Sequence, residues 1–118
     1  KCDYKIMTRS GGHQYSGLSS CTSKCAQIDM ANYNDIHLFP ESNTFKIGVG
    51  NRLKNVYEAL NSTGFFAAHG ECKTVGIGGH FQSGGVGINL RQFGADTDSV
   101  IAFDIILANG QKRHISDE

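Results

Sequence analysis

The sequence of 118 residues lacks net charge, a run of like charges, a long apolar stretch and an internal repeat. Its 11 basic and 11 acidic residues are scattered, so the electrostatic pattern of a nucleic-acid-binding domain is missing. No apolar run approaches about eighteen residues, which argues against a membrane span within the sequence. No leader of charged and then apolar residues is visible, and because a signal peptide can be removed, the cellular location stays open, with secretion as one option.

Glycine is abundant instead, at 15 residues, and it gathers in two loops. The first loop is Arg9–His13, in which Gly11 and Gly12 can take the left-handed backbone angles of a turn that points several amide hydrogens at one anion. Arginine, serine and the nearby Tyr15 add side-chain donors, and His13 places an imidazole directly after the glycines. A plain tight turn, with His13 as a satisfied polar residue, is the alternative.

The second loop follows Cys72 and is denser in glycine. Each interior glycine costs about 0.5–1 kcal/mol relative to alanine, so this density argues against a packed helix or strand and favours a backbone that lies against a ligand. A flexible linker is the alternative, but linkers rich in glycine rarely carry interleaved valine, isoleucine and phenylalanine. The glycines are Gly76, Gly78, Gly79, Gly84, Gly85 and Gly87.

Together, these loops resemble the FAD-binding domain of the vanillyl-alcohol oxidase and p-cresol methylhydroxylase superfamily, in its berberine-bridge-enzyme-like and oligosaccharide-oxidase branch. A third similar segment, residues 93–110, ends in an Asn-Gly turn, so the resemblance covers nearly the whole sequence. Departures from the family pattern occur at Lys73, at Met30-Ala31 and at Ser99. The matching loop positions are Arg9, Ser10, Gly11, Gly12, His13, Tyr15 and Gly17, and then Gly70, Cys72, Val75, Gly76, Gly79 and His80.

The resemblance implies that FAD is the cofactor and that two covalent bonds hold it. His13 would be bonded to the 8α-methyl group of the flavin and Cys72 to its C6 atom. The amides of residues 10–13 would bind the pyrophosphate, and Ile106 would offer a main-chain contact near the adenine. The glycines at 76, 79 and 84 would let the chain approach the cofactor. For His80, both a hydrogen bond near the flavin ring and a local backbone contact are open.

The activity implied by the resemblance is that of an FAD-dependent oxidoreductase, in particular an oxidase. A hydride would pass from a bulky alcohol-type substrate, such as an oligosaccharide, an alkaloid or an aromatic alcohol, to flavin N5, and oxygen would be reduced to hydrogen peroxide. No catalytic base can be assigned, because in this family it usually belongs to the substrate domain. We therefore expect residues 1–118 to be a partial FAD-binding domain, with the start of the domain upstream and the substrate domain downstream.

The predicted fold is α+β, part of a two-subdomain FAD-binding fold and mainly its antiparallel-sheet subdomain with flanking helices. Strands are predicted at residues 4–8, 24–30, 36–39, 44–49, 100–108 and 111–115, and the fifth of these is predicted to be buried. Asn51 is predicted to cap a helix that runs to about Asn61, with Leu53, Val56, Tyr57 and Leu60 on its apolar face.

The four cysteines allow two other interpretations, disulfide bonds and a zinc site. In a secreted protein they could form two disulfides, with Cys21 and Cys25 close enough in sequence to be partners. A zinc site with His13 or His80 is disfavoured, because only this one pair has the short spacing of zinc ligands. Cys2 and Cys72 complete the set, and without its glycine-rich surroundings Cys72 would be read as an inert buried thiol.

Two further function classes remain as alternatives. A non-catalytic flavin- or nucleotide-binding module would retain the glycine loops but would not explain a cysteine beside the second one. A disulfide-stabilised secreted interaction domain would explain the thiols but not the density of glycine. The flavoenzyme is therefore the preferred hypothesis.

Overall fold

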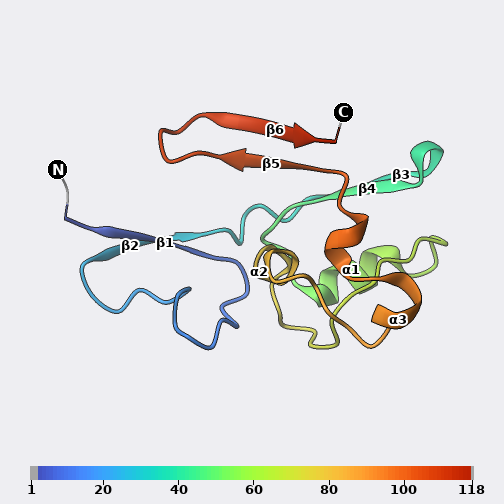
Figure 1. The fold of residues 1–118 in the computed structure, drawn as a ribbon, viewed down its shortest axis with the longest axis horizontal. Helices are drawn as coiled ribbons and strands as arrows, with labels where there is room; N and C mark the ends of the chain where they lie inside the picture. Colours follow the sequence, from blue (N-terminus) through green and yellow to red (C-terminus); the bar gives the residue numbers. More distant parts are fainter. Residues whose placement is uncertain (1–2, 118) are drawn as a thin grey trace.

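The computed structural model describes residues 3–117, drawn as a ribbon in Figure 1. Within this range the strands form three separate two-stranded sheets. The six strands end within two residues of the predicted positions, which confirms them. They are β1 (Lys5–Arg9) with β2 (Cys25–Asp29), β3 (Ile36–Phe39) with β4 (Thr44–Ile47), and β5 (Ala102–Ile106) with β6 (Lys112–Ser116).

The first pair of strands is parallel and the other two pairs are antiparallel. The antiparallel pairs turn where the sequence predicts: η1 (Pro40–Ser42) and the left-handed Asn43 join β3 to β4, and the left-handed Gly110 follows β5. Parallel pairing needs a long crossover, and here residues 10–24 make it. In Figure 1 the β5–β6 hairpin runs along the top, apart from the helices.

Helix α1 (Leu53–Leu60) carries the hydrophobic core. Leu53, Val56 and Leu60 are buried, and they pack with Ile77 from the second glycine loop. Tyr57 lies on the same face but is only partly buried. The apolar face read from the sequence is therefore confirmed, and burying each aliphatic side chain of this kind contributes roughly 1.5–3 kcal/mol.

The predicted cap of this helix is wrong, because Arg52 and not Asn51 is its N-cap residue. Asn51 is buried, and its side-chain amide donates to the carbonyl of Gly48 at 3.0 Å. The first two helical amides, those of Leu53 and Lys54, donate to carbonyls of residues 75 and 73. The second glycine loop thus takes the place of a side-chain cap and is fixed to the start of α1.

Two further expectations are also wrong. The glycine-dense segment contains a short helix, α2 (Ile77–Gln82). Within it, Gly78 packs closely against the segment after β4, since an added Cβ atom would lie 3.1 Å from the Val49 carbonyl oxygen. Strand β5 is mostly exposed, since β6 is its only strand neighbour within residues 3–117. The remaining short helices are α3 (Leu90–Phe93) and η2 (Asp96–Ser99).

Candidate functional site

The two glycine loops cross each other with their backbones in direct contact. A Cβ atom added to Gly11 would lie 2.1 Å from the amide nitrogen of Gly76, and one added to Gly76 would lie 2.1 Å from the amide nitrogen of Gly11. Real Cβ atoms do not come so close to backbone atoms. Both positions therefore require glycine for a close approach of two chains, and the loops form one continuous surface.

Ser10 fastens this crossing. Its hydroxyl donates to the carbonyl of Val49 at 2.6 Å and accepts from the amide of Gly78 at 3.3 Å. The half-buried serine hydroxyl is thus bound by two protein groups, and it joins the turn after β1 to the segment after β4 and to the start of α2. Sequence reasoning placed this hydroxyl among donors to a ligand, whereas in the structure it serves the contact between the loops.

The turn after Ser10 leaves backbone donors on the surface. Gly12 adopts a left-handed backbone angle, φ 77°, and the Arg9 side chain lies beside it. Gly12 and His13 are exposed, and within residues 3–117 their amides donate to no acceptor. Neighbouring free amides in such a turn form a small anion-binding surface.

Thr74 brings the two nucleophilic side chains to one place. Its hydroxyl oxygen lies 2.9 Å from Nε2 of His13 and 4.0 Å from the sulfur of Cys72. All three residues are exposed, and Cys72 is a free thiol. Sequence reasoning missed Thr74, because its position between cysteine and valine does not reveal the direction of its side chain.

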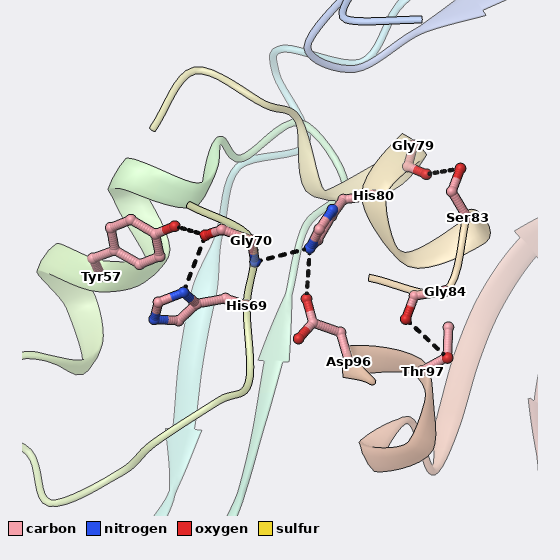
Figure 2. A network of polar contacts seen from close by, with 9 residues as sticks. All are labelled: Tyr57, His69, Gly70, Gly79, His80, Ser83, Gly84, Asp96 and Thr97. Carbon is pink, nitrogen blue, oxygen red and sulfur yellow. Dashed lines mark hydrogen bonds and ion pairs between the residues drawn. The ribbon is translucent and has the colours of Figure 1, made fainter. Parts of the chain in front are cut away.

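The other end of the second loop is held by His80, as Figure 2 shows. Nε2 of His80 accepts a hydrogen bond from the amide of Gly70 at 3.1 Å and lies 2.9 Å from Oδ2 of Asp96. Of the two readings left open for His80, the structure contains the local backbone contact. Burial lowers the pKa of His80, with a smaller contribution from His69 in the same direction.

Asp96 lies in the third segment that resembles the family, residues 93–110, but sequence reasoning assigned it no role. Its side chain is 2% exposed, and burial raises its pKa to about 6, although His69 opposes the rise. Gly85 has a left-handed φ of 68°, and a Cβ atom there would lie 2.4 Å from the Cβ atom of Asp96. Gly85 is therefore needed to admit the aspartate.

The remaining expected site residues differ in their surroundings. Gly79 and Gly84 have open space where a Cβ atom would stand, so another molecule can approach their backbone. Val75 is half-buried against the core. Gly17 lies in an open turn of the crossover, and Ile106 lies exposed on β5, in a hairpin that Figure 1 shows away from the crossing loops.

Cys21 and Cys25 form a disulfide, as their spacing suggested, and Cys2 lies outside the described residues. Within residues 3–117, no group of three or more histidine, cysteine, aspartate or glutamate residues could hold a metal ion. The helices in this part of the chain are all too short, or too polar, to cross a membrane.

Comparison with protein families identifies the family of this chain. Residues 1–116 match the model of the FAD binding domain family. The chain belongs to this family. The FAD-binding domain resembles the reticuline oxidase of Eschscholzia californica, with 38% identity over 115 residues, which is 93% of this chain and 21% of that protein.

Solved structures agree with the sequence comparison. The domain superposes on a berberine-bridge-enzyme-like protein of Physcomitrella patens with a TM-score of 0.88 at 30% identity, covering 96% of this chain and 25% of that one. It superposes on the xylooligosaccharide oxidase of Myceliophthora thermophila with a TM-score of 0.84 at 29% identity, covering 97% and 24%. The predicted α+β FAD-binding fold is confirmed, and the chain spans about a fifth to a quarter of the length of these relatives.

The crossing loops of the domain fit FAD by their chemistry. The exposed amides at Gly12 and His13 suit a pyrophosphate, and the open backbone at Gly79 and Gly84 suits close contact with a flat or extended molecule. An exposed imidazole and an exposed thiol, both in contact with Thr74, add two nucleophiles on the same surface.

Proposed function

We propose that this FAD-binding domain belongs to an FAD-dependent oxidase that holds its flavin by two covalent bonds, one to His13 and one to Cys72. The observation that carries the proposal is the convergence of both side chains on Thr74, at the crossing of the glycine loops. Two nucleophiles brought to one exposed place from opposite loops are suited to a cofactor that spans both loops.

The residues of the domain bind and orient the cofactor. The amides at Gly12 and His13 bind the pyrophosphate, and the glycines at 79 and 84 admit the cofactor against the backbone. His13 and Cys72 would act as tethers of the cofactor and not as proton shuttles. Bound FAD supplies the hydride acceptor at flavin N5 and the route by which oxygen is reduced to hydrogen peroxide.

The proposed substrate is a bulky alcohol-type molecule, such as an oligosaccharide, an alkaloid or an aromatic alcohol. Support comes from the relatives: one is named a reticuline oxidase, and one is a xylooligosaccharide oxidase in complex with xylobiose. A cofactor held by covalent bonds stays in place without a closed pocket around it, which suits a site open enough for large substrates.

The test is intact and peptide mass spectrometry of the full-length protein, with His13→Ala and Cys72→Ala as single variants. We expect one FAD mass that bridges the peptides containing His13 and Cys72, and each variant should retain the flavin through the other residue alone. Flavin on His13 only would refute the double attachment. Unmodified peptides without flavin absorbance would refute the proposal as a whole, and bound flavin without turnover of any alcohol would indicate a non-catalytic binding module.

A further inference from the structure

Asp96 is a buried carboxyl group that the proposed function does not use. It begins η2, and its side chain is 2% exposed. Oδ2 lies 2.9 Å from Nε2 of His80, while Oδ1 has no hydrogen-bond partner within residues 3–117. A carboxylate in this position would be poorly solvated, since an ionised group inside a protein needs several partners.

The contacts of His80 determine where the proton of this pair lies. The amide of Gly70 donates to Nε2, so Nε2 presents its lone pair and the imidazole carries its hydrogen on Nδ1. An unprotonated nitrogen attracts a carboxyl oxygen at 2.9 Å only if that oxygen carries a hydrogen. The geometry therefore points to a neutral carboxylic acid at Asp96, whose hydrogen shares the single lone pair of Nε2 on a neutral His80 with the amide hydrogen of Gly70. The raised pKa of Asp96 and the lowered pKa of His80, both caused by burial, agree with this arrangement.

The pair holds a backbone segment that leads to Cys72. The amide of Gly70 is bound by His80, and its carbonyl accepts from the hydroxyl of Tyr57 and lies 3.1 Å from Nδ1 of His69. Figure 2 shows this residue between the tyrosine on α1 and the histidine on α2. Cys72 follows two residues later, so the position of its loop depends on these contacts.

We propose that Asp96 is a positioning residue: its carboxylic hydrogen keeps His80 in the tautomer that binds the Gly70 amide, and its ionisation releases that amide. When Asp96 loses its proton, the carboxylate attracts a hydrogen onto Nε2, and the imidazole hydrogen moves from Nδ1 to Nε2 through solvent. Nε2 then donates to Asp96 and no longer accepts from Gly70. The loop before Cys72 is held at acidic pH and loosened as the pH rises through about 6.

Other titratable side chains interact electrostatically with Asp96 and His80, and each shifts a pKa in a defined direction. His69, beside Gly70, lowers the pKa of Asp96 and that of His80 when it is charged. Tyr57, on α1, has a raised pKa, caused first by its burial and then by Asp96, Cys72 and Glu71, so it stays neutral across this range. The backbone contact of Gly70 and the protonation of Asp96 and His80 do not depend on covalent attachment of flavin.

Two measurements on the full-length protein test the proposal. Hydrogen exchange with mass spectrometry, on peptides that cover residues 68–72 and normalised to α1, should show protection that falls roughly fivefold as the pH rises from 5 to 7.5, after correction for intrinsic exchange. Nitrogen-15 shifts of labelled His80 should show hydrogen on Nδ1 at pH 5 and on Nε2 at pH 7.5. Protection that does not change with pH, or Nε2 that carries hydrogen at pH 5, would overturn the proposal.

Variants separate positioning from packing. In Asp96→Asn the side-chain amide can donate to Nε2 at every pH, so protection of residues 68–72 should be retained and become independent of pH. In Asp96→Ala protection should be lost at every pH. Asp98→Asn is the matched control, because Asp98 lies in the same short helix and binds the Ala95 amide instead of His80. If Asp96→Asn and Asp98→Asn both keep the wild-type pH dependence, Asp96 is not the responsible group, and the proposal is wrong.

Discussion

Replacing Gly76 by alanine tests whether the two glycine loops cross as the structure has them. The added Cβ atom would lie 2.1 Å from the amide nitrogen of Gly11 and 2.3 Å from the hydroxyl oxygen of Ser10. The Ser10 hydroxyl is itself held by the backbone carbonyl of Val49 and the backbone amide of Gly78, and the contact with Gly11 is with its backbone, so neither neighbour can rotate away. The loops must move apart instead.

The expected loss follows from this geometry. Overpacking a fitted interior costs typically 1–3 kcal/mol, and a clash with backbone should fall at the upper end, about 3 kcal/mol. The second loop also binds the first amides of α1, so its displacement reaches the core. Urea unfolding of the purified protein, followed by far-ultraviolet circular dichroism, measures the change in the free energy of unfolding. Under the proposed function, the amount of covalently bound flavin, measured by absorbance after denaturation, should fall as well.

Gly79→Ala is the matched control in the same segment. Apart from its chain neighbours and the backbone of its own helix, no heavy atom of the described residues lies within 4 Å of a Cβ atom at Gly79. Gly79 stands inside α2, where alanine is favoured over glycine by up to about 1 kcal/mol. This variant should be as stable as the wild type or more stable, whatever it does to flavin binding. A Gly76→Ala protein with wild-type stability, or equal losses in both variants, would refute the crossing of the loops.

The remaining predictions concern a hydroxyl and an ion pair. Thr74→Ala should lower the fraction of protein with flavin bonded to His13, because the 2.9 Å contact that orients the imidazole is lost, whereas Thr74→Ser should retain it; peptide mass spectrometry checks both. Asp104 binds Lys46 and His114, each at 2.9 Å, and these contacts hold its pKa down to about 2. A carboxyl group whose pKa is lowered in the folded state stabilises the fold at pH values above its ordinary pKa, and this stabilisation is lost as the pH falls toward about 2. Asp104→Asn should therefore lower the free energy of unfolding slightly at pH 7 and by less at pH 3, as measured by urea unfolding.

Local patterns in the sequence predicted the local elements well. The alternation and the turn residues predicted six strands, and the spacing of Leu53, Val56 and Leu60 predicted the buried face of α1. These patterns depend on neighbours along the chain, so no tertiary information is needed to read them. The glycine loops were found in the same way, because glycine is needed where backbones approach closely.

Long-range partners were not predictable from the same patterns. The helix cap at Asn51 was wrong because the backbone carbonyls of Val75 and Lys73, 22 and 19 residues further along the chain, bind the amides of Leu53 and Lys54. Thr74 and Asp96 were not singled out, since their importance comes from His13 and His80, which other segments supply. The exposure of β5 could not be read from its apolar sequence, because burial depends on which layer covers a strand.

The crossing of the loops also bears on when the site can form. Its hydrogen bonds join residues 61 and 68 positions apart, so a growing chain that ends at α1 contains the first loop without its counterpart. Contacts of high sequence separation require closure of a long loop before they stabilise anything, and they form late in folding. Under the proposed function, capture of the cofactor by both loops therefore follows synthesis and docking of α2. A chain that stalls earlier carries His13 on an open turn, with no second surface to hold a flavin.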